Sequence, residues 1–191
     1  EYDIIVVGAG PGGSFAAKTS AESGYDTLLL EKEVVTKEGR YKACGGAMAW
    51  ELVEEIDYPE EKIGRVIDTL ELHHIDGETY SKQGKGAVVW RSVFDQFLTM
   101  KAVEAGAELK EEEGLESISK SGESYEIITP KGKYRANYVL AADGVTSKTL
   151  KILDWPYFQK EDLILTITQE MKSTKKKKSS SLSKSLIKGM H

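Results

Sequence analysis

A glycine pattern near the start of the chain constrains the fold more than any other feature. Gly8, Gly10 and Gly13 follow the apolar run YDIIVV, and a segment with helical spacing comes next. Gly8 allows a tight turn, Gly10 lets a diphosphate approach the backbone, and Gly13 lets the helix pack closely on the strand. A second buried strand, YDTLLLEK, ends near Glu31, where a carboxylate accepts hydrogen bonds from an adenosine ribose. These residues predict a β-α-β unit with parallel strands that binds a dinucleotide.

This fingerprint is shared by sites for NAD and for FAD, and a second motif separates them. In YVLAADGVTSKTL, residues 138–150, a buried strand ends at Asp143-Gly144 and a helix begins near Ser147. The aspartate can accept hydrogen bonds from ribityl or ribose hydroxyls, and the glycine lets a cofactor come close. Together with the first motif, this arrangement favours a flavin.

Arg91 adds a third feature, at the start of the helical segment SVFDQFLTMKAVEAGAEL. A cation is electrostatically unfavourable at the N-terminus of a helix. A guanidinium there can instead reach a phosphate or the edge of a flavin. The alternative is a solvated arginine.

The remaining patterns predict an α/β fold, in which a parallel sheet is interrupted by antiparallel insertions. Residues 33–47 form a loop, AMAWELVEEI forms a short helix, and 64–90 form antiparallel strands around a turn at Asp76-Gly77. The acidic run Glu111-Glu112-Glu113 is interpreted as solvated. His73 and His74 are adjacent in a strand and point to opposite faces, so the sequence predicts no metal site.

Composition limits the compartment and the partners. The chain has one cysteine, which excludes a disulfide framework, and no apolar run near the roughly 20 residues that span a membrane. We therefore expect a cytoplasmic protein. Residues 171–191 carry seven lysines and no acid, leaving 19 basic against 31 acidic residues in the rest. This acidic body argues against nucleic acid as a partner. The lysine- and serine-rich tail is predicted to be disordered, and the alternative role for its lysines is peripheral contact with anionic lipids.

Four segments together resemble the geranylgeranyl reductase family of flavoproteins, in particular its archaeal digeranylgeranylglycerophospholipid reductases. They are YDIIVVGAGPGGSFAAKTSAESGYDTLLLEK, KACGGAM, WRSVFDQFLTMKAVEAGAEL and LAADGVTSK. The resemblance covers residues 2–170 and implies the p-hydroxybenzoate hydroxylase fold, FAD as cofactor, an isoprenoid lipid substrate, and NAD(P)H or ferredoxin as electron donor. The cofactor-binding residues predicted from the motifs and the resemblance are Gly8, Gly10, Gly12, Gly13, Glu31, Lys32, Cys44, Gly45, Ala47, Arg91, Leu115, Asp143 and Gly144.

The resemblance also gives the lone Cys44 a role, because in that family a cysteine followed by glycine lies where the chain passes the flavin ring. Gly45 and Gly46 would turn backbone N–H groups toward the ring, and Lys42 would add positive potential. Cys44 is then the candidate catalytic residue, a proton donor to a carbon of the alkene. The alternative is a small buried side chain without a chemical role.

The resemblance divides the chain into residues 1–170, the first part of an FAD-binding domain, and the tail at 171–191. Residues 64–90 are predicted to add strands to a substrate-domain sheet. The family continues well beyond residue 170, so the sequence is interpreted as C-terminally truncated. In the implied reaction a reduced flavin delivers hydride to one alkene carbon, and a proton reaches its neighbour. The alternatives are an FAD-dependent aromatic monooxygenase or halogenase of the same fold, and an inactive nucleotide-binding fragment.

Overall fold

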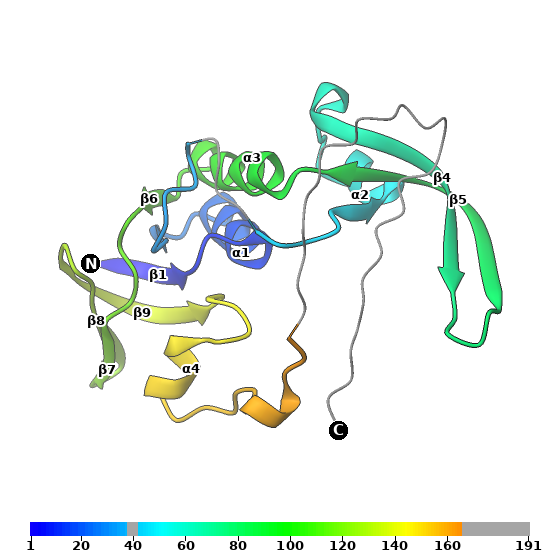
Figure 1. Cartoon of the computed structure of the whole chain (residues 1–191). Coiled ribbons are helices and arrows are strands. Elements are labelled where there is room, and N and C mark those ends of the chain that lie inside the picture. Colours follow the sequence, from blue (N-terminus) through cyan, green and yellow to red (C-terminus); the bar gives the residue numbers. More distant parts are fainter. Residues whose placement is uncertain (38–41, 166–191) are drawn as a thin grey trace. The chain divides into compact units, whose positions relative to one another are not determined.

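The computed structural model describes residues 1–37 and 42–165 of the chain, so the tail at 171–191 lies outside the described residues. The chain divides into two compact units (Figure 1). The described residues of Glu1–Tyr41 and Ser92–Asp162 form the first unit, and those of Lys42–Arg91 and Leu163–His191 form the second.

The first unit is built on a six-stranded sheet with the order β6-β2-β1-β9-β8-β7. Its strands are β1 (Tyr2–Val7), β2 (Thr27–Leu30), β6 (Glu108–Lys110), β7 (Ser117–Ser121), β8 (Ser124–Ile128) and β9 (Lys133–Ala141). β6, β2, β1 and β9 are parallel, whereas β7 and β8 continue the sheet as antiparallel strands. The predicted α/β fold with a parallel sheet and antiparallel insertions is confirmed.

Helices α1 (Pro11–Glu22) and α3 (Arg91–Glu104) pack on one face of this sheet. Gly13, Ser14 and Ala17 form the buried side of α1, and such small residues let the helix approach the strands closely. The apolar cluster on this face contains Val6, Ala9, Ala17, Leu29, Val35, Ala102 and Ala107. The cluster on the opposite face contains Ile5, Val7, Leu28, Leu30, Leu115, Ile118, Ile127 and Ala136. The short elements α4 (Lys148–Ile152) and η2 (Lys160–Asp162) follow β9.

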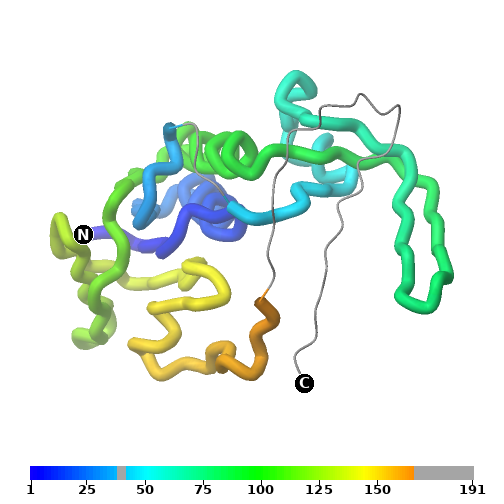
Figure 2. Tube along the Cα trace, viewed as in Figure 1, coloured from blue at the N-terminus to red at the C-terminus, as the bar shows by residue number. Residues whose placement is uncertain are grey.

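The second unit contains a three-stranded antiparallel sheet with the order β3-β5-β4. Its strands are β3 (Ala47–Ala49), β4 (Ile63–His73) and β5 (Thr79–Val89). The helix α2 (Trp50–Glu55) and the 3₁₀ helix η1 (Glu60–Lys62) connect β3 to β4, and a turn connects β4 to β5. Figure 2 shows β4 and β5 as a long two-stranded ribbon in the tube trace, and the two strands pair antiparallel. The predicted turn is present, because Gly77 has φ +94° and Glu78 donates its backbone N–H to Asp76.

The predicted helix over AMAWELVEEI is wrong for its first three residues. Ala47–Ala49 form β3 and pair with residues 86–88 of β5, and α2 begins only at Trp50. Backbone pairing to a neighbouring strand, which helical spacing cannot reveal, overrides the local helical preference of these residues.

The predicted burial of the strand before Asp143 is also wrong in part. Tyr138 and Leu140 of β9 are 66% and 39% exposed. β8 pairs with β9 only as far as Ala136, so over residues 137–141 β9 pairs with β1 alone among the described strands. One edge of this half-strand is therefore open, and open edges favour association with other strands.

Among the described residues, no helix is long and apolar enough to cross a membrane.

Candidate dinucleotide-binding site

The carboxyl ends of the parallel strands converge at one edge of the first unit's sheet, where open α/β sheets bind their ligands. Backbone hydrogen bonds hold the loops beyond these strands together. Gly8 donates to the carbonyl of Leu30 at 2.7 Å, and Ala142 donates to that of Val7 at 2.9 Å. The glycine-rich loop after β1 is thus fixed between the ends of β2 and β9.

Two of the fingerprint glycines are required by the protein's own backbone. Gly8 has φ +102°, and a Cβ there would lie 2.5 Å from the carbonyl oxygen of Ala142. A Cβ at Gly13 would lie 1.7 Å from the carbonyl oxygen of Gly8. Any side chain at either position would therefore force the turn, or the contact between α1 and β1, apart.

The other two glycines have no such reason within the described structure. A Cβ at Gly10 or Gly12 would meet no atom of the described residues within 4 Å. Gly10 is the N-cap residue of α1 and supplies no side-chain cap to the first-turn N–H groups. The first-turn N–H groups of α1 therefore receive no side-chain hydrogen-bond acceptor from Gly10, and there is space next to Gly10 and Gly12. We call this space with its N–H groups the cradle, and it fits a diphosphate.

Glu31 is oriented by backbone donors from two loops. Its side chain is buried, and its carboxylate accepts the N–H of Ala9 at 2.8 Å and that of Glu33 at 3.0 Å. The first bond joins Glu31 directly to the glycine loop, so the carboxylate lies beside the loop of the fingerprint to which it belongs. The next residue, Lys32, is exposed.

Asp143 accepts hydrogen bonds that hold the start of α4, in addition to any contact with a ligand. Its carboxylate accepts the backbone N–H groups of Lys148 at 2.8 Å and Thr149 at 3.0 Å and the hydroxyl of Ser147 at 2.5 Å. It thereby secures the first turn of α4, for which Ser147 is the N-cap. Gly144, at φ +87°, allows the turn between strand and helix. The predicted contact of Asp143 with ribityl or ribose hydroxyls stays a prediction.

The Asp143 carboxyl should make stability depend on pH. Burial tends to raise its pKa, but the hydrogen bonds from Ser147, Lys148 and Thr149 outweigh burial and hold the pKa below its usual value. A carboxyl with a lowered pKa in the folded state contributes stability above its unfolded pKa, and that stability is lost as pH falls through the folded pKa. We expect Asp143→Asn to unfold at a lower urea concentration at pH 7, and the difference from wild type to shrink below about pH 4.

The matched control for this comparison is Glu116→Gln, which changes an exposed carboxylate. Urea titrations of both variants from pH 7 to pH 3 measure the effect. A difference between Asp143→Asn and wild type that stays constant over this range would contradict the account.

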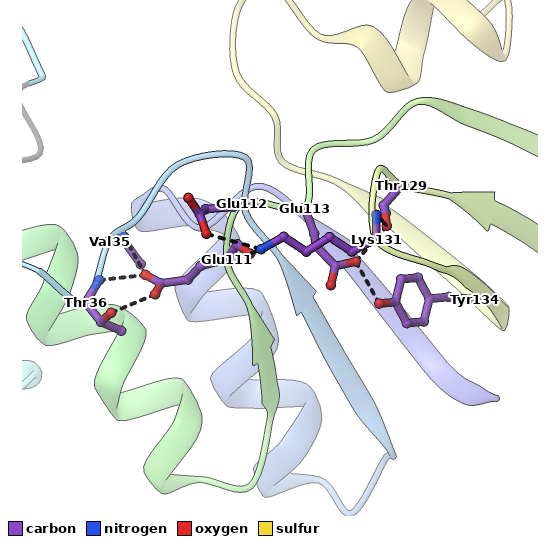
Figure 3. A network of polar contacts seen from close by, with 8 residues as sticks. All are labelled: Val35, Thr36, Glu111, Glu112, Glu113, Thr129, Lys131 and Tyr134. Carbon is purple, nitrogen blue, oxygen red and sulfur yellow. Dashed lines mark hydrogen bonds and ion pairs between the residues drawn. The ribbon is translucent and has the colours of Figure 1, made fainter.

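The interpretation of the acidic run after β6 as solvated is wrong for Glu111 and Glu113, and only Glu112 is exposed (Figure 3). Glu113 is buried and accepts the hydroxyls of Thr129 at 2.6 Å and Tyr134 at 2.7 Å. Glu112 is exposed and pairs with Lys131 at 3.2 Å. Glu111 accepts hydrogen bonds from the segment after β2. The three consecutive carboxylates thus point in different directions and bind different partners. The composition of the run does not reveal this difference.

Leu115 lies close to this run, but its side chain belongs to the apolar cluster of the sheet. A cofactor contact at this position would therefore have to come from its backbone.

In the second unit, Cys44 is exposed, which contradicts the alternative of a small buried side chain. Its sulfur accepts the backbone N–H of Gly46 at 3.4 Å. Gly46 has φ +66°, and a Cβ there would lie 2.1 Å from the carbonyl oxygen of Val89. Gly46 is thus the residue of this pair that must be glycine, whereas a Cβ at Gly45 would meet no atom of the described residues within 4 Å.

The predicted site residues divide between the two units. The first unit brings together the glycine loop, Glu31 and the turn at Asp143-Gly144. Cys44, Gly45, Ala47 and Arg91 belong to the second unit. Ala47 is exposed in β3, and Arg91 is half-buried as the first residue of α3. Their contacts with a cofactor stay predictions. Sequence reasoning missed the backbone donors of Ala9 and Glu33, because N–H groups carry no sequence signal.

Comparison with known protein families shows to which family this chain belongs. The family model for glucose inhibited division protein A matches residues 3–190. The chain belongs to this family. Curated relatives include digeranylgeranylglycerophospholipid reductase 2 of Methanopyrus kandleri, 36% identical over 155 residues, and a digeranylgeranylglycerophospholipid reductase of Methanocella arvoryzae, 37% identical over 160 residues. Each match covers 78% of this chain but only 39% and 40% of the relative. The chain therefore spans about 40% of the length of these relatives.

Solved structures agree with these relatives. A geranylgeranyl bacteriochlorophyll reductase-like protein from Thermoplasma acidophilum has a TM-score of 0.67 at 28% identity, over 76% of this chain and 40% of that protein. A halogenase in complex with phloroglucinol and FAD has a TM-score of 0.64 at 20% identity, over 80% and 36%. That second likeness shows the fold alone. The resemblance to geranylgeranyl reductases found in the sequence is confirmed.

Proposed function

We propose that this chain carries the dinucleotide-binding portion of an FAD-dependent oxidoreductase that saturates double bonds in isoprenoid precursors of membrane lipids. One observation carries the proposal. The open cradle over Gly10 and Gly12 lies at the N-terminus of α1, and Glu31 is joined to the same loop through Ala9. A diphosphate and an adenosine ribose are the groups that this pair of features fits.

The first-unit residues would hold the cofactor as follows. The backbone of Gly10 and Gly12 would receive the diphosphate, and Glu31 would receive the ribose hydroxyls. The turn at Asp143-Gly144 would lie toward the ribityl chain, with Asp143 also keeping α4 in place. FAD supplies a hydride equivalent when it is bound and reduced. The names of the relatives support a geranylgeranyl lipid as the substrate class. FAD is the proposed cofactor, and NAD(P)H or ferredoxin is the proposed electron donor.

The second unit would serve the substrate. We assign its ribbon of β4 and β5 to a substrate-domain sheet, and we assign the exposed Cys44 thiol as proton donor to the alkene carbon next to the one that receives hydride. Lys42 would add positive potential near this thiol. We propose that the protein is cytoplasmic and acts at the membrane surface, because its proposed substrate is a membrane lipid.

A second candidate is an aromatic monooxygenase or halogenase, because the FAD-bound halogenase has the same fold. The two candidates differ in their use of oxygen. The reductase converts the lipid without consuming oxygen, whereas the second class consumes oxygen with its substrate.

The test is a chimera in which residues 2–165 replace the matching segment of the Methanocella arvoryzae relative, because the chain alone spans only part of such a protein. We expect the purified chimera to contain FAD and, with dithionite as donor, to add two hydrogens per double bond to a geranylgeranyl lipid under anaerobic conditions. Mass spectrometry of the lipid measures the result. A nicotinamide nucleotide in place of FAD, or FAD without lipid reduction, would contradict the proposal.

Cys44→Ser in the same chimera tests the proton donor. We expect turnover to fall at least about tenfold while FAD content stays within error, because a hydroxyl is a far weaker acid than a thiol. Ala43→Ser serves as the neighbouring control for local packing, since Ala43 is exposed and is not among the predicted site residues. Unchanged turnover in Cys44→Ser would assign the cysteine to a role other than proton transfer.

A further inference from the structure

Glu111 makes contacts that the dinucleotide fingerprint does not account for. It follows β6 directly, and its carboxylate reaches across to the segment after β2 (Figure 3). One oxygen, Oε1, accepts the backbone N–H groups of Val35 at 2.5 Å and Thr36 at 2.6 Å. The other, Oε2, accepts the hydroxyl of Thr36 at 2.7 Å. A single carboxylate thus receives three hydrogen bonds from two consecutive residues.

The segment that Glu111 holds begins at Glu31. Within it, Glu33 donates its N–H to Oε1 of Glu31 at 3.0 Å. Further along, Val35 is buried in the apolar cluster beneath α1, and the Gln96 side chain of α3 donates to the carbonyl of Thr36. The backbone of Glu31 is held by the carbonyl of Lys110 at 2.9 Å and by the N–H of Glu113 at 2.8 Å, and the Glu31 side chain is held by Ala9. At the far end of the segment, the backbone of residues 35–36 is held by Glu111 and Gln96.

The electrostatics favour this arrangement. Burial tends to raise the pKa of Glu111, but the hydrogen bonds from Thr36 and Val35 and the charge of Lys37 outweigh burial and keep the pKa below its usual value. The carboxylate is therefore ionised at neutral pH, and bonds from N–H groups to an ionised acceptor are stronger than those between neutral groups.

We propose that Glu111 is a positioning residue for the adenosine end of the dinucleotide site. By fixing Val35 and Thr36, it sets the backbone of Glu33, whose N–H fixes the carboxylate of Glu31. Glu111 does not contact the ligand in this account and acts only through Glu31. The inference rests on the proposed function, because it assumes that Glu31 binds the ribose.

The geometry makes a specific thermodynamic prediction. If Glu111 acts through Glu31, its removal should weaken binding only while the Glu31 carboxylate is present. The two substitutions should then be non-additive in a double-mutant cycle. A residue that merely stabilises the fold would give the same effect in both backgrounds, or no effect on affinity under native conditions.

The experiment uses the 191-residue chain with ADP as probe, since ADP contains the ribose and the diphosphate without the flavin. Isothermal titration would compare wild type, Glu111→Ala, Glu31→Ala and the double variant. We expect Glu111→Ala to weaken ADP about five- to tenfold, the loss expected for one misplaced hydrogen bond. In the Glu31→Ala background the same change should have an effect below about twofold.

Two further variants separate the outcomes. Glu111→Gln keeps an acceptor for the backbone N–H groups and should restore part of the affinity; it also replaces Glu111→Ala if the latter does not fold. Glu112→Ala removes the neighbouring exposed carboxylate and should bind ADP as wild type does. Wild-type affinity in both Glu111 variants, or equal effects in the two Glu31 backgrounds, would overturn the inference. If wild type itself does not bind ADP or FAD, the proposed function fails as well.

Discussion

Gly13→Ala is expected to destabilise the first unit by about 3 kcal/mol. The new Cβ would lie 1.7 Å from the carbonyl oxygen of Gly8, and this oxygen belongs to backbone that cannot rotate away. Relief requires α1 to move off the sheet, which would open the apolar cluster that contains Val6 and Ala17. Urea unfolding followed by circular dichroism measures the loss.

Gly12→Ala is the matched control, because it adds the same methyl group one position earlier. Gly12 is exposed within α1, and its Cβ would meet no atom of the described residues within 4 Å. Alanine is a better helix former than glycine, so the free energy of unfolding should stay equal or rise by up to about 1 kcal/mol. If Gly12→Ala destabilises the chain as much as Gly13→Ala does, the assignment of these two glycines to different tasks is wrong.

Much of the first unit is predictable from the sequence because its signals are local. The apolar run before Gly8, the small residues of α1 and the second run before Glu31 each specify an element and its neighbour. The β-α-β connection then fixes a parallel pairing, because the helix returns the chain to the edge of the sheet where the first strand began. This crossover is nearly always right-handed. The site at the carboxyl ends of the strands follows from that topology.

The features that sequence reasoning missed depend on contacts distant in the chain. Ala47–Ala49 form a strand because β5 offers backbone partners about forty residues away. Tyr138 and Leu140 have the pattern of a buried strand, yet both side chains are exposed in the described structure. Burial depends on which elements lie opposite, and one strand's pattern does not contain that information.

The acidic run shows the same limit at the site. Glu111, Glu112 and Glu113 are chemically identical, but one holds a backbone segment, one pairs with a surface lysine and one is buried against two hydroxyls. The donors come from residues 35–36 and 129–134, far away in sequence. Glu31 was predictable because its spacing from the glycines is part of a motif, whereas Glu111 belongs to no motif.

Glu31→Ala is the second change with a large expected effect. The substitution removes the carboxylate proposed to bind the ribose, a loss of roughly 1.5–3 kcal/mol in the free energy of FAD binding. The dissociation constant should therefore rise by about ten- to a hundredfold. Because Ala9 and Glu33 also lose their acceptor, Glu31→Gln is the companion variant that keeps one acceptor oxygen and separates lost folding from lost recognition.

Titration of FAD and of FMN into the purified chain, followed by flavin fluorescence, tests the central claim most directly. FMN contains the flavin without the adenosine half, so a site built from the glycine loop and Glu31 should bind FAD and leave FMN unbound. The affinity for FAD should be modest, because the chain spans about 40% of the length of its relatives, and it should fall in Glu31→Ala. FMN binding as tight as FAD binding, or FAD binding unchanged in Glu31→Ala, would contradict the account.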